Sequence, residues 1–357
     1  MTALQMVLLI IISNADRRIN RIYSWDFMRI LAGDIGGTNA RLAYLDDDSS
    51  KPTRIDRTYA SIEYSCFEEI LGEFFSSNNI QPRFDAVCIA IAGPVLSGCA
   101  AVTNLPWKLC ESSLSSLLQT KRVCLINDLV AVAHAIPCLQ EKEVVFLQQG
   151  AGDRNLHTTN GSVIVAVGTG LGAAHLKRFD AHLVTCSSEA GHTGFSPETT
   201  LQETLLHWLH RRHSHVSKEM LLSGRGIYTL YRFFRDHYGL SESDPVKQAI
   251  QHSDPARVIS EHAIIGDDQL CIQTLECFAE ILGAVAGDIV LHYYPVDTFY
   301  LAGGIPAKIL PFLKQRTFIE AFCNKGPMRS YLSKIEVKLL LTELSGLNGA
   351  IVQAKKL

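Results

Sequence analysis

The sequence predicts an α/β protein built from two similar halves with a cleft between them. Each half opens with an apolar strand, a glycine-rich turn and a second strand, at residues 30–46 and again at residues 162–179. Apolar runs of strand length end in Gly, Asn or Asp, which is the usual punctuation of strands. A chain of 357 residues also has room for two domains of about 100–200 residues each.

The first half is predicted to continue as an alternation of strands and helices. Apolar residues recur at helical spacing in some stretches and form short unbroken runs in others. The unbroken runs predict strands buried in a sheet, and the spaced residues predict helices that cover it. The predicted strands are 30–35, 40–46, 53–61, 86–93 and 123–128, and the predicted helices are 66–75, 111–120 and 129–136.

The second half repeats this opening and then becomes largely helical. A helical region is predicted over 201–292, and within it Asp254 followed by Pro255 is typical of an N-cap with proline at the first helical position. The stretch 267–294 is apolar on most faces and predicts a buried central helix. The remaining predicted strands are 162–167, 173–179, 181–186, 296–302 and 335–343, and a helix at 347–356 closes the chain.

Composition argues against several classes of function. The net charge is −3 and the basic residues form no long block, so neither a nucleic acid nor a membrane is predicted as a partner. The ten cysteines occur singly and without a CxxC pair, which predicts free thiols, no zinc framework and a reducing, cytoplasmic location. His207 and His210 lack an acid or a cysteine to complete a metal site, so a solvated helix end is predicted there.

Residues 1–27 are predicted to be a disordered or non-native extension. Their apolar run 6–12 is much shorter than the ~20 residues that span a bilayer, and no positive charge precedes it. Met28 stands directly before the first predicted strand. A membrane tether is the alternative, although so short an apolar run anchors weakly.

The turn between the first two strands has the composition of a phosphate-binding loop. Paired glycines let the chain turn tightly and point main-chain N–H groups outward, and such a nest of donors binds anions. A single carboxylate in this turn, Asp34, suits a hydrated Mg²⁺ held through its waters. An ordinary hairpin is the alternative, although this polar content is unusual for one. The predicted phosphate contacts are Gly33, Asp34, Ile35, Gly36, Gly37, Thr38 and Asn39.

A second glycine turn, at 168–172, predicts another phosphate loop. Its GxGxxG/A pattern, with Glu189 placed 21 residues after Gly168, also resembles a dinucleotide-binding fingerprint. That fingerprint requires the turn to open a helix, whereas residues 173–179 have the pattern of a strand. The lysine signature of a P-loop is absent as well. The predicted contacts are Gly168, Thr169, Gly170 and Gly172, with Gly303 and Gly304 at a third strand end where an adenosine would lie.

Asp128 is the candidate catalytic base. It follows the apolar strand and precedes the helical stretch 129–136, so it lies at a carboxyl end of a strand, where α/β folds bind ligands. A carboxylate there accepts the proton of a hydroxyl nucleophile when it lies within hydrogen-bond reach. Asp also fills the N-cap position of a helix well, and the residues alone leave both roles open.

Nine segments, taken together, resemble the bacterial glucokinase family. They occur in the family's order and approximate spacing, and the resemblance extends over nearly all of the chain from residue 28 to its end. The resemblance implies the fold of the actin-like ATPase superfamily, in which two ribonuclease-H-like lobes close on ATP and a sugar. The segments are LAGDIGGTNARLA, IAIAGPV, AVTNLPW, INDLVAVAHAIP, VGTGLGAAHL, EAGHTGFSP, HVSKEMLLSGRGIYTLYR, AGGIPAKIL and GLNGA.

The resemblance implies an enzyme that transfers the γ-phosphoryl group of ATP to the 6-hydroxyl of glucose, with Mg²⁺ as the metal and Asp128 as the base. It also implies a homodimer, a small domain of 28–138 plus 343–357, and a large domain of 139–342. No zinc is expected, because the clustered CxCGxxGC of a related branch is absent. The sugar contacts implied by the matching motifs are Asn104, Asn127, Asp128, Glu189, His192 and Glu219.

Two positions depart from the family's pattern. Ala190 stands where the motif usually written EGGH has glycine, which restricts the backbone beside Glu189 if a positive φ is needed there. Arg225 adds a charge close to the expected region between the sugar and the phosphates. A kinase for another hexose or an N-acetylhexosamine, and a non-catalytic sugar sensor on the same fold, are the alternative functions.

Overall fold

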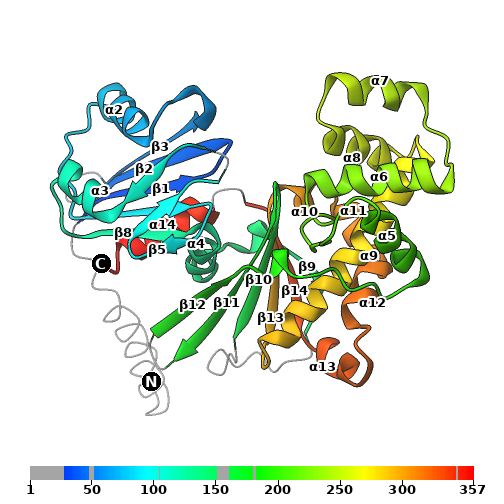
Figure 1. The fold of residues 1–357 in the computed structure, drawn as a ribbon. Helices are drawn as coiled ribbons and strands as arrows, with labels where there is room; N and C mark the ends of the chain where they lie inside the picture. The colour runs from blue at the N-terminus through cyan, green and yellow to red at the C-terminus, as the bar shows by residue number, and fades with distance from the viewer. Residues whose placement is uncertain (1–27, 48–51, 104, 151–160, 180–181, 343–344) are drawn as a thin grey trace, which may run out of the picture. The chain divides into compact units, whose positions relative to one another are not determined.

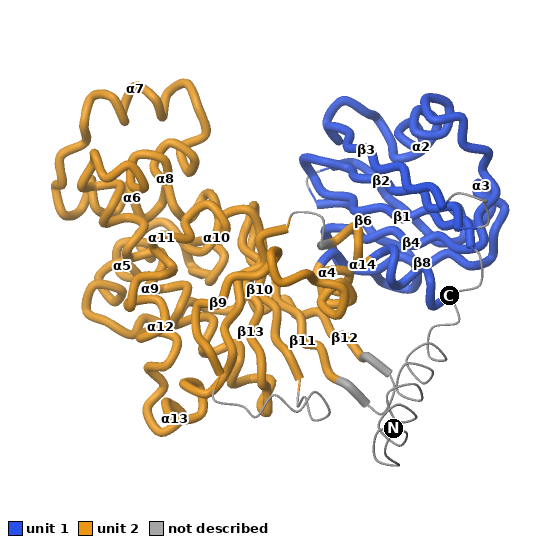
Figure 2. Tube along the Cα trace, turned by 180° about the vertical axis from the view of Figure 1, so that it is seen from behind, with its two compact units in different colours: residues 1–128, 350–357 blue, residues 129–349 orange. Residues whose placement is uncertain are grey.

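The protein forms two compact units, each with its own sheet and helices (Figures 1 and 2). The computed structural model describes residues 28–47, 52–103, 105–150, 161–179, 182–342 and 345–357. Unit 1 is the described part of Met1–Asp128 together with Ala350–Leu357, and unit 2 is Leu129–Gly349. The predicted extension 1–27 and the candidate sugar contact Asn104 lie outside the described residues.

The sheet of unit 1 has the strand order β3-β2-β1-β4-β8. Neighbours among β1, β2 and β3 are antiparallel, whereas β1, β4 and β8 run parallel. Alternate residues such as Leu31, Val87 and Leu125 are buried on one face against α2 (Phe67–Ser77) and α3 (Glu111–Leu118). The strands are β1 Arg29–Ile35, β2 Asn39–Asp46, β3 Thr53–Ala60, β4 Ala86–Ile91 and β8 Val123–Asn127.

The sheet of unit 2 repeats this arrangement, with the order β12-β11-β10-β13-β14-β9. Again three strands form an antiparallel run, and β10, β13 and β14 run parallel, while β9 adds an antiparallel edge. The predicted duplication of a strand–turn–strand α/β fold is therefore confirmed. The strands are β9 Val144–Gln148, β10 Ser162–Val167, β11 Leu171–Phe179, β12 His182–Ser188, β13 Thr298–Ala302 and β14 Glu336–Leu340.

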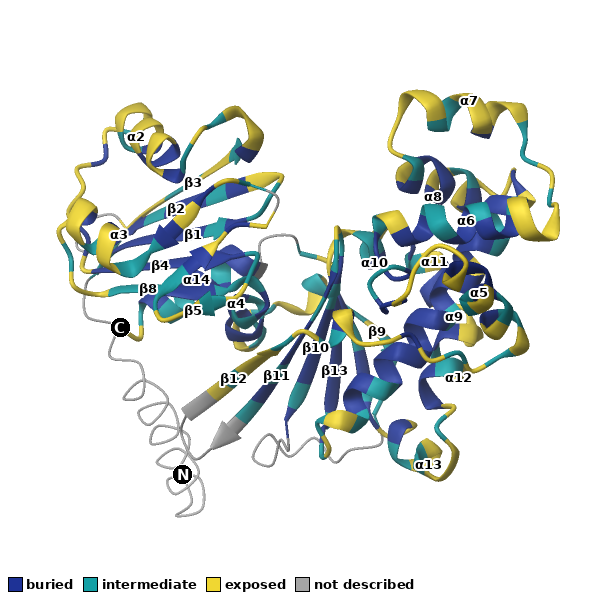
Figure 3. Cartoon of the chain, in the orientation of Figure 1, coloured by how far each residue is buried: buried dark blue, intermediate teal, exposed yellow. Residues whose placement is uncertain are grey.

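Helices bury the sheet of unit 2, and α9 is the most deeply buried of them. Figure 3 shows α9 dark blue along most of its length, as the all-round apolar pattern predicts. No helix in the part of the chain that the structure describes combines the length and the apolar character needed to span a membrane. The helices are α5 Thr200–His210, α6 Gly224–Tyr238, α7 Asp244–His252, α8 Pro255–Ile265, α9 Gln269–His292, α10 Gly304–Lys308, α11 Leu310–Leu313, α12 Arg316–Cys323 and α13 Arg329–Leu332.

The helical region predicted over 201–292 is interrupted. The segment between α5 and α6 is not helical, and it contains Glu219. Within the region, the predicted cap is confirmed: α8 begins at Pro255, and the Asp254 carboxylate accepts a hydrogen bond from Ala256 N at 3.3 Å. The divided helices leave a loop whose polar residues reach the predicted site, which a continuous helix would not allow.

Two helices, α4 (Asp128–Ala135) and α14 (Ser345–Ala354), contain the points at which the chain passes from one unit to the other. Ala133 of α4 packs in unit 2 with Ile164 and Tyr300, on the sheet face opposite α9. The domain boundaries suggested by the sequence, at 138 and 342, stay a prediction.

The expectation that all ten cysteines are free thiols is wrong. Cys99 and Cys110 form a disulfide, while the other eight cysteines are free. The physical reason is strand register. Strands β5 (Val95–Leu96), β6 (Cys99–Ala101) and β7 (Lys108–Cys110) form a small antiparallel sheet in which these two cysteines are directly opposite, with their Cα atoms 4.1 Å apart. No spacing motif in the sequence reveals that pairing.

Candidate active site

Three parallel strands of unit 1 end in one row. Ile35 at the end of β1 lies opposite Ile91 of β4, which in turn lies opposite Asn127 of β8. The glycine turn after β1 and Asp128 after β8 therefore leave the sheet at the same edge. This is the carboxyl edge, where α/β folds bind ligands. The structure thus places the predicted phosphate turn and the candidate base at one edge of one sheet.

The turn after β1 is anchored through its carbonyl oxygens. Gly36 N donates to Asn39 O at 2.9 Å. Ser61, which follows β3, donates from its main chain to Thr38 O at 2.9 Å and from its hydroxyl to Gly36 O at 2.8 Å. Among the described residues, the amides of Gly37 and Thr38 donate no hydrogen bond. The turn therefore presents donors outward while its carbonyls are held, which suits an anion.

Gly33 and Ile35 lie inside β1 rather than in the turn. Gly33 is buried between Ile89 and Leu42, and the Ile35 side chain is part of the core. Any phosphate contact from these two residues would come from the main chain, and their predicted role stays a prediction.

Asp34 is a poorly solvated carboxylate that lies beside an arginine. It lies opposite Arg41 in the β1–β2 register, with 3.6 Å between Asp34 Oδ2 and Arg41 Nη1. Burial raises the pKa of Asp34, and the neighbouring Arg41 lowers it by a smaller amount. The ionised carboxylate is therefore poorly solvated in the folded protein, and a bound cation would stabilise it.

The Asp34→Asn variant is expected to be more stable than the parent protein at pH 7.5. The raised pKa means that the folded state binds the proton more tightly than the unfolded state, so ionised Asp34 destabilises the fold above that pKa. The stability advantage of the variant should shrink as the pH falls toward 3.8, the ordinary value of this carboxyl. Thermal unfolding of both proteins at pH 7.5 and 4.5 measures this. An advantage that grew toward acid pH would contradict the assignment.

Asn127 and Asp128 are held by the start of α4 and by the segment after β4. Helix α4 begins at Asp128, so this carboxylate lies in the first turn, where the helix dipole favours negative charge. Asn127 Nδ2 donates to Gly93 O at 3.1 Å. Thr103 holds the same segment, donating its hydroxyl to Ala92 O at 2.7 Å. The Asn127 amide is thus tied to the segment after β4, and Asp128 begins the next helix.

The glycine turn of unit 2 follows the same design. The Gly168 carbonyl accepts a hydrogen bond from Gly224 N, at the start of α6, at 3.0 Å. Leu171 N donates to Oε2 of Glu219 at 3.0 Å. Thr169 is exposed, and its amide donates no hydrogen bond among the described residues. A second turn with anchored carbonyls and an open amide therefore lies at the carboxyl end of β10.

Gly303 and Gly304 differ in what they require. Gly303 follows β13 and has φ +99°, a conformation that side chains rarely adopt, and a Cβ there would meet the main chain of Val167. Gly304 begins α10 and has open space around its Cα. The third glycine site therefore lies beside the end of β10, next to the turn at 168–172.

Three predicted sugar contacts come together in unit 2. Glu189 precedes a short 3₁₀ turn, Ala190–His192, and its carboxylate lies 3.7 Å from His192 Nε2. Glu219 N donates to Gly191 O at 2.9 Å. The Glu189 and His192 side chains are 72% and 64% exposed, so both are accessible to a ligand. Because Glu219 also accepts from Leu171, this group adjoins the second glycine turn.

The alanine that departs from the family's motif fits its place. Ala190 has no positive φ: in the described part of the chain, the non-glycine residues with positive φ are Asn79, Ser97 and Gln119. The glycine that the turn requires is Gly191, because a Cβ there would collide with the carbonyl of Leu171. The other departure, Arg225, is exposed in the first turn of α6.

Several residues that form hydrogen bonds with these turns were not predicted from the sequence. Ser61 acts 25 residues away from the turn that it anchors, so no local pattern announces it. Gly224 does have a signal, because the preceding Ser223 is a helix N-cap whose hydroxyl accepts from Gly226 N. Lys218 and Thr193 were missed as well, and their contact also spans 25 residues.

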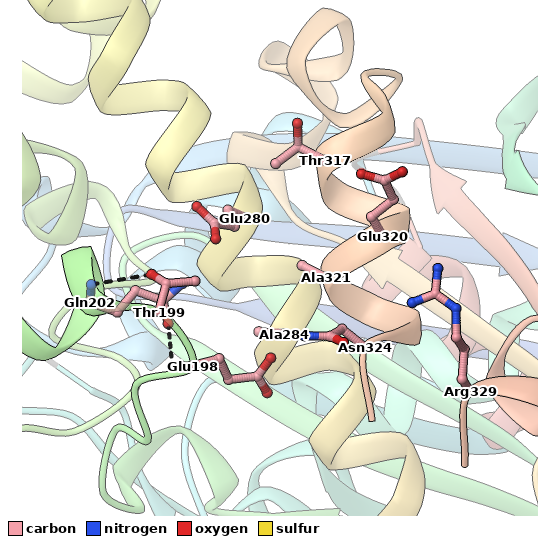
Figure 4. Close-up of a pocket in the computed structure, with 10 residues that line it drawn as sticks. All are labelled: Glu198, Thr199, Gln202, Glu280, Ala284, Thr317, Glu320, Ala321, Asn324 and Arg329. Atoms are coloured by element: carbon pink, nitrogen blue, oxygen red, sulfur yellow. Dashed lines mark hydrogen bonds between the residues drawn. The ribbon is translucent and has the colours of Figure 1, made fainter. Parts of the chain in front are cut away.

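A polar pocket of about 270 Å³ lies elsewhere in unit 2 (Figure 4). None of the predicted site residues lines it. Burial, and to a smaller extent Glu198, raises the pKa of Glu280 in this pocket. Because the pocket shares no lining residue with the predicted site, it is separate from the candidate active site. Its lining residues are Glu198, Thr199, Gln202, Glu280, Ala284, Thr317, Glu320, Ala321, Asn324 and Arg329.

Comparison with known proteins identifies the family to which the chain is similar. The family model described as Glucokinase matches residues 31–357. A glucokinase of Nostoc sp. (strain PCC 7120) is 34% identical over 92% of this chain and 99% of its own length. A glucokinase structure from an Antarctic psychrotroph superimposes with a TM-score of 0.78 at 30% identity, over 93% of this chain and all of its own. The fold is shared with a glucokinase of Balamuthia mandrillaris in complex with glucose, with a TM-score of 0.74 at 21% identity, over 95% of this chain and 96% of that one.

Proposed function

The chain belongs to the glucokinase family of ATP-dependent hexose kinases, and we propose that it transfers the γ-phosphoryl group of ATP to the 6-hydroxyl of glucose. The observation that supports this most directly is the row formed by Ile35, Ile91 and Asn127. It sets Asp128, one residue past the row, at the same sheet edge as the phosphate turn after β1. A hydroxyl to be activated and a phosphate to be transferred need these two features in one place.

Asp128 is the proposed general base. Its carboxylate accepts the proton of the sugar hydroxyl as the oxygen attacks the γ-phosphorus, and the bond from phosphorus to the oxygen of the leaving ADP breaks. The start of α4 fixes the position of this carboxylate. The neighbouring Asn127, tied to Gly93 O, is the proposed amide contact to the sugar.

The two glycine turns are the proposed phosphate contacts. Their outward amides, together with the hydroxyls of Thr38 and Thr169, donate to phosphate oxygens and offset negative charge as it is redistributed during transfer. Gly303 and Gly304 are proposed to border the adenosine.

Asp34 is the proposed contact for Mg²⁺, through the ion's waters. When bound, Mg²⁺ neutralises charge on the ATP phosphates. No group of three or more His, Cys, Asp or Glu side chains in the described residues is placed to hold a metal. A single buried carboxylate fits an ion whose other ligands are waters and phosphates. Asp34 would hold that hydrated ion through its waters.

Glu189, His192 and Glu219, with Asn104 and Asn127, are the proposed sugar contacts. Carboxylate, imidazole and amide groups pair with neighbouring hydroxyls of a hexose. A buried polar group left unpaired by the wrong epimer costs about 1–3 kcal/mol, which is how such a set selects among hexoses.

An ADP-release assay over a panel of hexoses tests this proposal. With ATP and Mg²⁺, glucose is expected to give a higher kcat/KM than mannose, fructose or N-acetylglucosamine. A higher kcat/KM for one of the other sugars would transfer the proposal to that substrate. No ADP release with any sugar would overturn the catalytic assignment in favour of a sugar sensor.

The resemblance also supports a homodimer that works in the cytoplasm. Light scattering coupled to size-exclusion chromatography tests the first part, because a dimer of this 39.4 kDa chain has twice the monomer mass. A single monomeric peak at working concentrations would overturn it.

A further inference from the structure

The segment 216–219, which precedes α6, is joined by main-chain hydrogen bonds to the segment 191–195. The second segment includes part of the turn at 190–192, which we call the sugar turn. Lys218 N donates to Thr193 O at 3.0 Å, and Glu219 N donates to Gly191 O at 2.9 Å. A third bond runs in the opposite direction between the same two segments, because Phe195 N donates to Val216 O at 2.8 Å. The sugar turn at 190–192 therefore depends for its position on the segment that contains Lys218.

The side chain of Lys218 adds a contact of an unusual kind. The residue is only 7% exposed, and its Nζ donates to the hydroxyl of Thr193 at 2.9 Å. Among the described residues it forms no ion pair. Burying an ammonium group without a counter-charge is unfavourable, and an apolar side chain of the same length would fill this space at lower cost. Stability alone does not account for a lysine here.

The contact continues from Thr193 into the turn itself. The Thr193 hydroxyl, which accepts from the ammonium, donates in turn to Ala190 O at 2.7 Å. A hydrogen bond from a charged donor is about twice as strong as a neutral one, and it polarises the next bond in the chain. The carbonyl of Ala190 is thus held by a charge-assisted relay of two hydrogen bonds.

Glu189 precedes the turn and His192 ends it, and both side chains are largely exposed. They contact each other, with 3.7 Å between the Glu189 carboxylate and His192 Nε2, so the direction of the pair depends on the backbone of the turn. We propose that Lys218 is a positioning residue for the sugar: through the Thr193 hydroxyl it fixes the turn at 190–192, so that Glu189 and His192 are already directed toward the hexose. This inference rests on the proposed function, because it takes these two residues as sugar contacts.

The Lys218→Met variant tests the role of the charge. Methionine keeps an unbranched apolar stem but removes the donor. We expect the KM for glucose, and its Kd measured by calorimetry without ATP, to rise about tenfold, while kcat and the KM for ATP stay within about twofold. A tenfold change corresponds to about 1.4 kcal/mol, which is within what a hydrogen bond from a charged group contributes.

The hydroxyl provides an independent test that leaves the lysine in place. Thr193→Val removes the relay while keeping the shape of the side chain, and it is expected to weaken glucose binding to a similar extent. Thr193→Ser restores the hydroxyl and should return the Kd to within about twofold of the parent value. The double variant Lys218→Met/Thr193→Val should be no weaker than the weaker single variant, because both interrupt one relay. If Lys218→Met fails to fold, the valine and serine pair still decides the proposal.

Lys325→Met is the matched control. This lysine has a side chain that is also only 7% exposed in unit 2, but it pairs with Glu198 and Asp288, neither of which belongs to the turn at 190–192. It should lower the unfolding temperature and leave the glucose Kd unchanged. The positioning role is overturned if Lys218→Met binds glucose normally, if serine fails to rescue, or if Lys325→Met weakens glucose binding equally.

The same measurements separate this inference from the proposed reaction. A parent protein that binds glucose but releases no ADP would refute the proposed kinase reaction and still allow the Kd comparison to judge Lys218. A parent protein that binds no glucose would refute both.

Discussion

The Asp128→Ala variant is expected to lose at least about 10²-fold in kcat. Without the carboxylate, the proton of the sugar hydroxyl has no acceptor at the moment of attack, and general-base catalysis typically contributes 10²–10⁴-fold. The KM for ATP should change little, because the turns at 36–39 and 168–172 are anchored by Ser61 and Gly224. Steady-state kinetics with glucose and ATP measure both quantities.

Two control variants separate the role of base from that of helix cap. Asp128→Asn keeps the shape of the side chain but cannot take the proton, so it should lose activity to the same extent. Asp254→Ala removes an aspartate that caps α8 by accepting from Ala256 N. It should lower stability by about 1 kcal/mol and leave kcat unchanged. Near-normal turnover by Asp128→Ala would refute the assignment.

The parts of the fold that the sequence predicted best are those whose contacts are local. The two strand–turn–strand openings pair residues close in the chain, as in the hairpin of β1 and β2, so alternation and paired glycines are enough to place them. The apolar pattern of α9 likewise needs no distant partner to be recognised. For the same reason the carboxyl-edge position of Asp128 could be inferred from the strand before it.

The parts that the sequence missed depend on partners far along the chain. Cys99 and Cys110 are 11 residues apart and meet because β6 and β7 pair in one particular register. Ser61 reaches back 25 residues to Gly36 O. Hydroxyl, thiol and ammonium groups follow no repeating pattern in the sequence from which their distant partners could be predicted. These partners are therefore identified only in the folded structure.

In the turn at 190–192, the sequence motif drew attention to the wrong residue as the one that requires glycine. The motif suggests that Ala190 restricts the backbone, because the family usually has glycine at this position. In the structure Ala190 takes an ordinary negative φ, and the restricted position is the next one, where Gly191 lies against the carbonyl of Leu171. Glycine is required where another segment of the folded chain lies too close for a side chain. The order of residues in a motif does not give that distance.

Gly191→Ala is therefore expected to be strongly damaging, whereas Ala190→Gly is not. A methyl group at 191 would force the sugar turn away from Leu171, which belongs to the second glycine turn and donates to Glu219. Overpacking of this kind typically lowers stability by about 1–3 kcal/mol. Because the displaced contact joins the turn at 190–192, proposed to bind the sugar, to the turn at 168–172, proposed to bind phosphate, we expect the KM values for glucose and for ATP to rise together, by about tenfold or more.

Ala190→Gly is the matched control one residue away. It should lower stability by at most about 1 kcal/mol through backbone entropy and change either KM by no more than about twofold. Thermal unfolding and steady-state kinetics on both variants measure these effects. The contrast with Lys218→Met is informative, since that variant should weaken glucose binding alone. Normal kinetics in Gly191→Ala would mean that the close approach to Leu171 does not couple the two turns, and a large defect in Ala190→Gly would place the constraint at the other residue.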